Sequence, residues 1–117
     1  IAKVEGKSPD ERLLERVNKV ISAHISDQSL TTDLIAQEVG LSRVHLYRKL
    51  KELTNQSSRD YVRNIRLAKA AELLSQKKMA VAEVSDLVGF SNPNNFATAF
   101  RELYGVTPTQ YMEDHLK

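Results

Sequence analysis

Four side chains near the middle of the chain combine positive charge, hydrogen-bond donors and apolar surface at helical spacing. They stand at positions i, i+3, i+4 and i+7, which a helix places on one face: Val44, Tyr47, Arg48 and Lys51. Arg48 can donate two hydrogen bonds to O6 and N7 of a guanine, and Val44 can contact the methyl group of a thymine. Arg43 and Lys51 can bind phosphates. We therefore predict noncovalent recognition of DNA, in which Val44, Tyr47 and Arg48 contact bases.

A second row of polar side chains, about fifty residues later, is much less basic. Asn94 and Asn95 carry amides that can hydrogen-bond N6 and N7 of an adenine, and Thr98 can bond a base or a phosphate. Asn92 and Arg101 are the candidates for contacts to the DNA backbone in this row. The difference in charge predicts an asymmetric pair, in which the first row supplies most of the affinity.

Two copies of one sequence pattern must position these rows. The segments 35–42 (IAQEVGLS) and 84–91 (VSDLVGFS) each indicate the end of a helix, a glycine and a tight turn. The small residues Ala36 and Ser85 stand where the two helices of each copy must cross closely. A second helix follows with an apolar stripe, formed by Leu46, Leu50 and Leu53 in the first copy and by Phe96, Phe100 and Leu103 in the second. This arrangement is typical of a helix-turn-helix motif.

Capping residues and helical periodicity predict seven helices and no strand. Ser8 and Glu11 can form a capping box, Thr31 or Thr32 caps the second helix, and Thr107 caps the last. Ser42 and Asn92 are the predicted caps of the two reading helices, and each is also a candidate for contact with the DNA backbone. The helices are predicted at about 9–25, 32–39, 43–53, 58–75, 80–88 and 93–104, with a last one starting at Pro108.

The predicted architecture is all-α and homeodomain-like, with two helix-turn-helix subdomains joined by a linker helix. Its parts are a tail or linker at 1–8, an N-terminal helix with the first subdomain at 9–57, the linker helix at 58–76, and the second subdomain at 77–117. Two reading helices on one scaffold could enter successive major grooves of DNA, about one helical turn apart.

The positive charge is concentrated in one part of the chain. The net charge is +2, but residues 42–78 contain ten Lys or Arg against three Asp or Glu, while the segments on either side are net negative. A localised basic stripe is typical of a nucleic-acid surface. Arg59 and Arg63 on the linker helix are candidates for phosphate contact, together with Arg66 and Lys69. A structural role fits Arg63 and Arg66 equally well, and the position of Arg66 suggests burial.

Several classes of function are excluded by composition. The chain has no cysteine, so disulfides, thiolate metal sites and cysteine nucleophiles are absent, which fits a reducing compartment such as the cytoplasm. His24, His45 and His115 lack metal-ligand spacing, and no glycine-rich phosphate loop is present. We therefore expect no catalysis, no metal and no cofactor. No apolar run approaches the roughly 20 residues that span a bilayer, and no signal peptide is visible. Because the chain begins at Ile1, we interpret it as a piece of a longer protein.

The second copy and the linker helix resemble the DNA-binding domains of the AraC/XylS family of bacterial transcription regulators. The resemblance rests on the segment 88–91 followed by Phe96, Phe100, Tyr104–Pro108 and Tyr111, and on residues 61–74. It implies sequence-specific binding to promoter DNA, with base contacts from Val44, Tyr47 and Arg48 and from Pro93, Asn94 and Thr98. Two residues depart from the family pattern. Pro93 cannot hydrogen-bond a base, and Thr98 stands where many relatives carry arginine.

A narrower resemblance concerns the capped helix at 9–25 and the segment 46–53. They look like the C-terminal output domains of hybrid two-component sensors, in which a sensor, a kinase and a receiver precede this domain. The AraC/XylS resemblance implies transcription activation as the usual outcome, with RNA polymerase as a partner. The narrower resemblance implies a place at the cytoplasmic end of a membrane-anchored sensor, and it leaves open whether domains outside this chain form a dimer. The fragment itself is expected to make no membrane contact.

One alternative comes from another class of function. The chain could be a helical protein-interaction module that contacts the transcription machinery without reading DNA, and the acidic segment 79–117 would suit a protein partner. Steep salt dependence together with preference for one DNA sequence separates the two hypotheses.

Overall fold

The computed structural model describes residues 7–114, and this range contains seven α-helices and no strand. The helices are α1 (Pro9–Ala23), α2 (Thr32–Glu38), α3 (Arg43–Thr54), α4 (Ser58–Gln76), α5 (Val81–Leu87), α6 (Pro93–Tyr104) and α7 (Pro108–Asp114). The predicted all-α class and helix order are confirmed. The end of α1 differs from its predicted position by two residues, and the other predicted helix ends differ by at most one. Most of the predicted tail at 1–8, and residues 115–117 of the predicted second subdomain, lie outside the described residues.

Side-chain caps explain why the helices begin where they do. Ser8 and Glu11 form the predicted capping box, in which the Ser8 hydroxyl accepts from the Glu11 amide at 3.1 Å and the Glu11 carboxylate accepts from the Ser8 amide at 2.8 Å. Thr31 rather than Thr32 caps α2, accepting from the amide of Leu34. The predicted caps Ser42, Asn92 and Thr107 also accept backbone amide hydrogens. Each such cap contributes about 1 kcal/mol.

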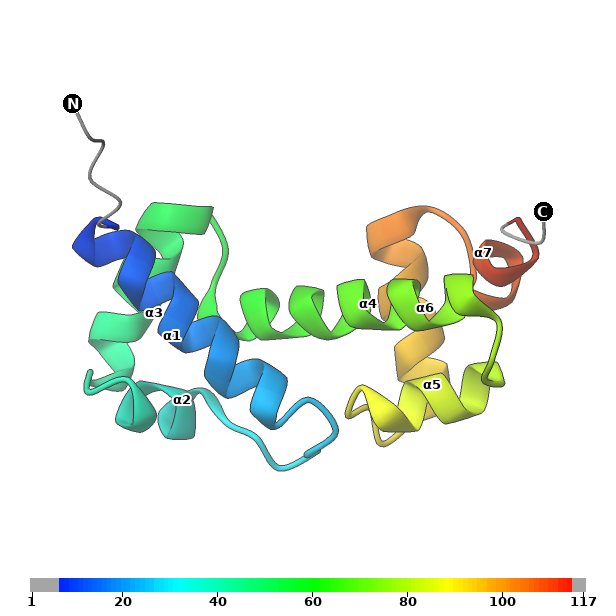
Figure 1. Ribbon diagram of the computed structural model, residues 1–117, viewed down its shortest axis with the longest axis horizontal. Coiled ribbons are helices and arrows are strands. Elements are labelled where there is room, and N and C mark those ends of the chain that lie inside the picture. The colour runs from blue at the N-terminus through cyan, green and yellow to red at the C-terminus, as the bar shows by residue number, and fades with distance from the viewer. Residues whose placement is uncertain (1–6, 115–117) are drawn as a thin grey trace.

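Two hydrophobic cores lie at the two ends of α4. The first core consists of residues from α1 to α3, namely Leu13, Val17, Ile21, Ile35, Ala36, Val39, Leu46 and Leu50. The second is built from α4, α5 and α6 by Leu67, Ala70, Ala71, Leu74, Val84, Val88, Phe96, Ala99 and Phe100. The N-terminal part of α4 packs on the first core through Tyr61, Val62 and Ile65. One helix therefore belongs to both halves and connects them (Figure 1).

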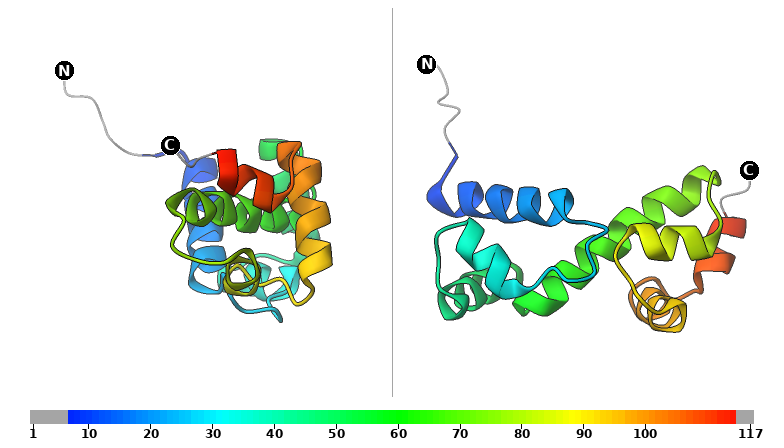
Figure 2. Two further views of the ribbon diagram at one scale, coloured as in Figure 1. Left: turned by 90° about the vertical axis from the view of Figure 1, so that its right-hand side faces the viewer. Right: turned by 90° about the horizontal axis from the view of Figure 1, so that it is seen from below.

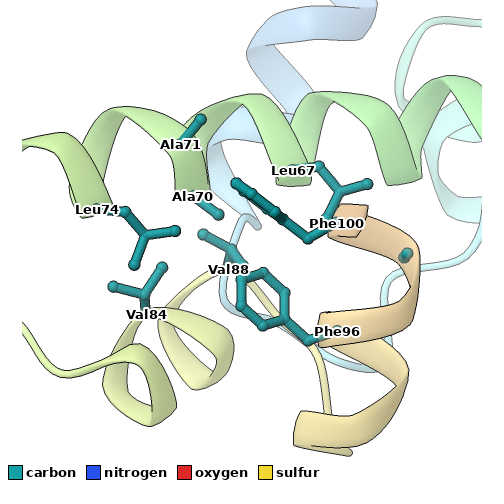
Figure 3. Close-up of a cluster of buried hydrophobic side chains, with 9 residues drawn as sticks. Leu67, Ala70, Ala71, Leu74, Val84, Val88, Phe96 and Phe100 are labelled. Carbon is teal, nitrogen blue, oxygen red and sulfur yellow. The ribbon is translucent and has the colours of Figure 1, made fainter. Parts of the chain in front are cut away.

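The second core departs from the repeat at one position. Phe96 and Phe100 point from α6 toward Leu67 and Val88 in the predicted way (Figure 3). Leu103, predicted to continue this stripe, is instead 44% exposed. Tyr104 takes its place, because its ring lies 4.6 Å from that of Phe100 and 5.5 Å from that of Tyr111. The aromatic residues of the stripe on α6 are therefore spaced by four, and the expectation for Leu103 was wrong.

The arrangement of the two halves places α3 and α6 on the same side of the molecule. Figure 1 shows them at opposite ends of α4, running in the same general direction. In the views of Figure 2 both lie away from α1. The molecule measures 45 × 39 × 23 Å along its principal axes, and α3 and α6 are separated along the longest of them (Figure 1).

Candidate nucleic-acid interface

The turns before the two reading helices begin with the same backbone geometry, although the second turn is one residue longer. Gly40 and Gly89 have φ angles of +78° and +89°, in the left-handed region that side chains resist. The following amides then bond back into the preceding helix, Leu41 to the carbonyl of Ala36 at 2.9 Å and Phe90 to that of Ser85 at 3.0 Å. Ala36 and Ser85 are buried, as predicted for close crossing points. Both motifs therefore fold as helix-turn-helix units.

The predicted row on α3 faces solvent. Val44 is 66% exposed and Tyr47 47% exposed, and Arg48 and Lys51 are exposed beside them. Leu46 and Leu50 are buried on the opposite side. An apolar and an aromatic side chain left in water next to two cations suit a partner that offers both methyl groups and negative charge, as the major groove of DNA does.

The charged groups of α3 divide between binding and packing. Arg43 pairs with Asp33 of α2 at 3.4 Å, but both side chains are well exposed, so the pair contributes little. Arg48 and Lys51 form no salt bridge within residues 7–114. Lys49 points back toward α1, where Asp10 at 3.0 Å, with help from Glu52, raises the pKa of its ammonium group. Lys49 therefore points toward α1 and away from the exposed row, while Arg48 and Lys51 remain available to a ligand.

The start of α4 extends the basic surface toward the second motif. Arg59 lines a shallow depression together with Arg43, Val44 and Tyr47 of α3. A larger groove of about 660 Å³ adjoins it, and its lining contains Arg59, Arg63 and the turn residues Gly89 and Phe90, among others. Within residues 7–114, Arg63 pairs only with half-buried Asp60, at 3.7 Å. Arg59 and Arg63 therefore line a groove on α4 that reaches from α3 to the turn before α6.

Two other linker residues behave differently. Arg66 is buried and bonded to backbone carbonyls, so its structural role is the correct interpretation. Lys69 pairs with Glu72 and lines a depression with Ser22 and Ile25, away from the groove that contains Arg59. Arg66 lines the same groove as Arg59 and Arg63, but both of its Nη atoms already donate to backbone carbonyls, whereas Lys69 lies outside that groove.

The face of α6 is polar but carries little charge. Asn94, Asn95 and Thr98 are exposed together with Pro93, which forms the first residue of the helix. Asn92 accepts the amides of Asn94 and Asn95 through Oδ1, at 2.7 and 3.3 Å, which leaves its Nδ2 to donate to a phosphate. The Ser42 hydroxyl has the same freedom in the first motif, since it too only accepts in its cap. Arg101 is exposed at the end of this row.

Thr31 and Thr32 were predicted only as capping residues. Both line the groove beside Arg59 and Arg63, and Thr32 also borders the surface of α3. The signal was present in the sequence, because the first helix of a helix-turn-helix crosses the DNA backbone and its polar N-terminal residues face it.

Metal-ligating side chains are not clustered in the described part of the chain. Across residues 7–114 no group of three or more His, Cys, Asp or Glu could hold a metal ion. His24 lies 3.7 Å from Asp27, His45 is exposed, and His115 lies outside the described range. Within the same range, every helix is too short or too polar to cross a bilayer.

Two helix-turn-helix units on one helix, with their outer helices turned to one side, define a two-headed helical DNA-binding module. A family model described as a helix-turn-helix domain matches residues 35–114. The chain is 34% identical over 104 residues to histidine kinase P4 of Formosa agariphila, a match that covers 89% of this chain and 8% of that protein.

Solved structures agree with the family model. The C-terminal domain of AraT, a response regulator from Geobacillus stearothermophilus, is 32% identical with a TM-score of 0.80, and the match covers 92% of this chain and 88% of that one. A transcriptional regulator from Chromobacterium violaceum, described as AraC-type, is 26% identical with a TM-score of 0.85, over 95% and 98% of the two chains.

The chain belongs to the AraC-type family of helix-turn-helix transcription regulator domains, as its resemblance predicted. It spans less than half the length of the first curated relatives that it matches.

Proposed function

We propose that this domain binds double-stranded DNA in a sequence-specific manner and regulates transcription, with α3 as its principal reading helix. The observation that carries the proposal is the exposed row on α3, where Val44, Tyr47 and Arg48 stand beside the basic groove of Arg59 and Arg63. Base contacts then come from Val44, Tyr47 and Arg48, and phosphate contacts from Ser42, Arg43, Lys51, Arg59 and Arg63.

The second reading helix contributes less. Asn94, Asn95 and Thr98 contact bases of the next major groove, and Asn92 and Arg101 hold the backbone there. Arg101 is the one basic residue between Met79 and Asp114, so α6 gains little from the release of counterions. We expect its half-element to be shorter or more degenerate than that of α3.

Selection of bound duplexes from a random pool, followed by measurement of affinity across salt concentration, tests the proposal. We expect one enriched motif with two half-elements about ten base pairs apart. One short element would mean that α3 alone reads. Failure to enrich any sequence, together with weak binding that vanishes as salt rises, would contradict the proposal.

In the whole protein, this domain would act as the output of a two-component system in the cytoplasm. Its likeness to part of a histidine kinase and to the end of a response regulator supports this role. Upstream receiver domains would then supply dimerisation. RNA polymerase is the expected protein partner, and Leu87 and Leu103 are two exposed apolar side chains on the acidic second half that such a partner could contact.

A further inference from the structure

The two halves meet at one buried guanidinium group beneath the middle of α4. Arg66 is 7% exposed. Its Nη1 donates to the carbonyl of Gly89 in the second motif at 2.8 Å, and its Nη2 donates to the carbonyl of Asp27 in the loop between α1 and α2, also at 2.8 Å. Figure 1 shows this loop and the turn before α6 approaching each other below α4. One side chain therefore connects backbone segments of both halves.

Gly89 is fitted to this junction in a way that Gly40 is not. A Cβ on Gly89 would lie 2.7 Å from Cζ of Arg66 and 2.7 Å from the carbonyl oxygen of Ile25, closer than real contacts allow. A Cβ on Gly40 would meet nothing within 4 Å, although both glycines have similar positive φ angles. The first glycine is thus required only by its backbone conformation. The second is required also because the two halves touch there.

Burying the charge of Arg66 is unfavourable for stability, which indicates that the residue has a specific role at this position. Burial lowers the pKa of the Arg66 guanidinium, and its Nε has no hydrogen-bond partner among the described residues. Two carbonyl oxygens of separate loops receive charge-assisted hydrogen bonds from its planar fork. A lysine carries a single donor nitrogen and no such fork, so it would not reproduce this pair of hydrogen bonds from two separate nitrogens.

Apart from Arg66, the halves are connected by α4 and by the backbone of Ile25, whose carbonyl oxygen lies close to Gly89. In the first half α1 packs on α2, α2 on α3 and α3 on α4, and in the second half α5, α6 and α7 each pack on the other end of α4. With a single shared helix, the two halves can still bend and twist relative to each other, because each core moves with its own end of the helix. A contact beside the helix axis removes that freedom.

We propose that Arg66 and Gly89 form a clamp that fixes the distance and angle between α3 and α6, and so sets the spacing of DNA half-elements that the domain accepts. The consequence for DNA rests on the proposed function, whereas the fixed geometry does not. Arg66 touches no DNA in this role and acts as a positioning residue.

Distance measurement between the halves tests the clamp without DNA. Because the chain contains no cysteine, spin labels can be attached at Lys19→Cys in α1 and Glu113→Cys in α7, both exposed. We expect a single narrow distance distribution for the parent protein and a broader or shifted one for Arg66→Lys. The matched control is Arg16→Lys, since Arg16 donates to the carbonyl of Val39 at 2.7 Å within the first half only. Its distribution should stay narrow.

Gly89→Ala provides a second variant should Arg66→Lys fail to fold, since the added methyl group would push the guanidinium out. Circular dichroism establishes that each variant retains its helices. An unchanged distribution in every folded variant of Arg66 and Gly89 overturns the clamp.

The consequence for DNA is measured with duplexes whose two half-elements are separated by the preferred spacing or by one base pair more or less. We expect the spacing preference to fall about tenfold in Arg66→Lys, toward that of two flexibly tethered readers. Affinity for the first half-element alone should stay as in Arg16→Lys. An unchanged spacing profile would overturn the second part of the proposal. Absence of any sequence preference in the parent protein would contradict the proposed function and leave the distance result to decide on the clamp.

Discussion

The two helix-turn-helix units have similar backbone geometry at the turn, but the side chains on their outer faces differ. Gly40 and Gly89 have nearly the same φ angle, and a small buried residue precedes each of them by four positions. Yet α3 lies in the basic segment 42–78, and α6 lies in a segment with a net negative charge. A few inward residues therefore determine the turn, while the outward residues are free to diverge.

The cores beneath the two reading helices differ as well. Under α3 the buried stripe is aliphatic, with Leu46 and Leu50, whereas under α6 it is aromatic. Phe100 lies 4.6 Å from the ring of Tyr104 and 5.4 Å from that of Tyr111. These rings therefore help to attach the last helix, which packs on α4 as well as on α6.

Removal of Phe100 should have the largest effect and tests this dependence. Phe100→Ala should lower the free energy of unfolding by about 3–5 kcal/mol, because it leaves a large cavity among buried residues. Urea unfolding followed by circular dichroism measures the change. The matched control is Leu103→Ala, three residues away and exposed, which should change stability by less than about 0.5 kcal/mol. A larger loss for Leu103 than for Phe100 would restore the stripe expected from the repeat.

Local rules account for what the sequence predicted well. The caps Ser8, Ser42 and Asn92, and the turn at Gly40, depend on residues within a few positions of each other. The exposed face of α3 follows from the helical period alone. These features are short-range, so one sequence was sufficient to predict them.

Tertiary contacts account for what the sequence left open or misplaced. The two acceptors of Arg66 lie 39 and 23 residues away from it, and no local pattern pairs them. Leu103 lost its place to Tyr104 because three aromatic rings, one of them from α7, pack better together than a leucine would. The order of helices is thus readable from periodicity, whereas the junction between the halves depends on how the cores orient two separate loops.

The difference between the two reading faces predicts the next largest effect. Joint replacement of Arg43 and Arg48 by glutamine should weaken binding to the selected DNA by about tenfold to a hundredfold, since a bidentate contact to guanine contributes about 1–3 kcal/mol. Joint replacement of Asn94, Asn95 and Thr98 by alanine should cost less. Fluorescence anisotropy at one salt concentration gives both values. Equal losses for the two faces would show that the domain reads symmetrically, against the charge argument.

The linker helix predicts a smaller and sequence-independent effect. Arg59→Gln and Arg63→Gln should each reduce the slope of log affinity against log salt by about 0.9, because each removes one phosphate contact. Lys69→Gln is the control on the same helix, since Lys69 lies outside the groove. A change in the slope for Lys69 equal to that for Arg59 would mean that DNA approaches a different side of α4.

The smallest expected effect concerns the ion pair in front of α3. Asp33 lies 3.4 Å from Arg43, and the equivalent position in the second motif is Ala82, which has no charge to offer. Asp33→Asn should change the free energy of unfolding by less than about 1 kcal/mol, because the pair is exposed and Asp33 otherwise only favours the N-terminus of α2. Binding to DNA should become about twofold tighter, since a negative charge beside the phosphates is removed and Arg43 no longer has to leave a partner. Titration of both proteins with the same duplex measures the difference. Weaker binding by Asp33→Asn would mean that the carboxylate orients Arg43 toward its phosphate. The larger contribution of the first motif to DNA affinity would then depend on the orientation of its side chains as well as on their charge.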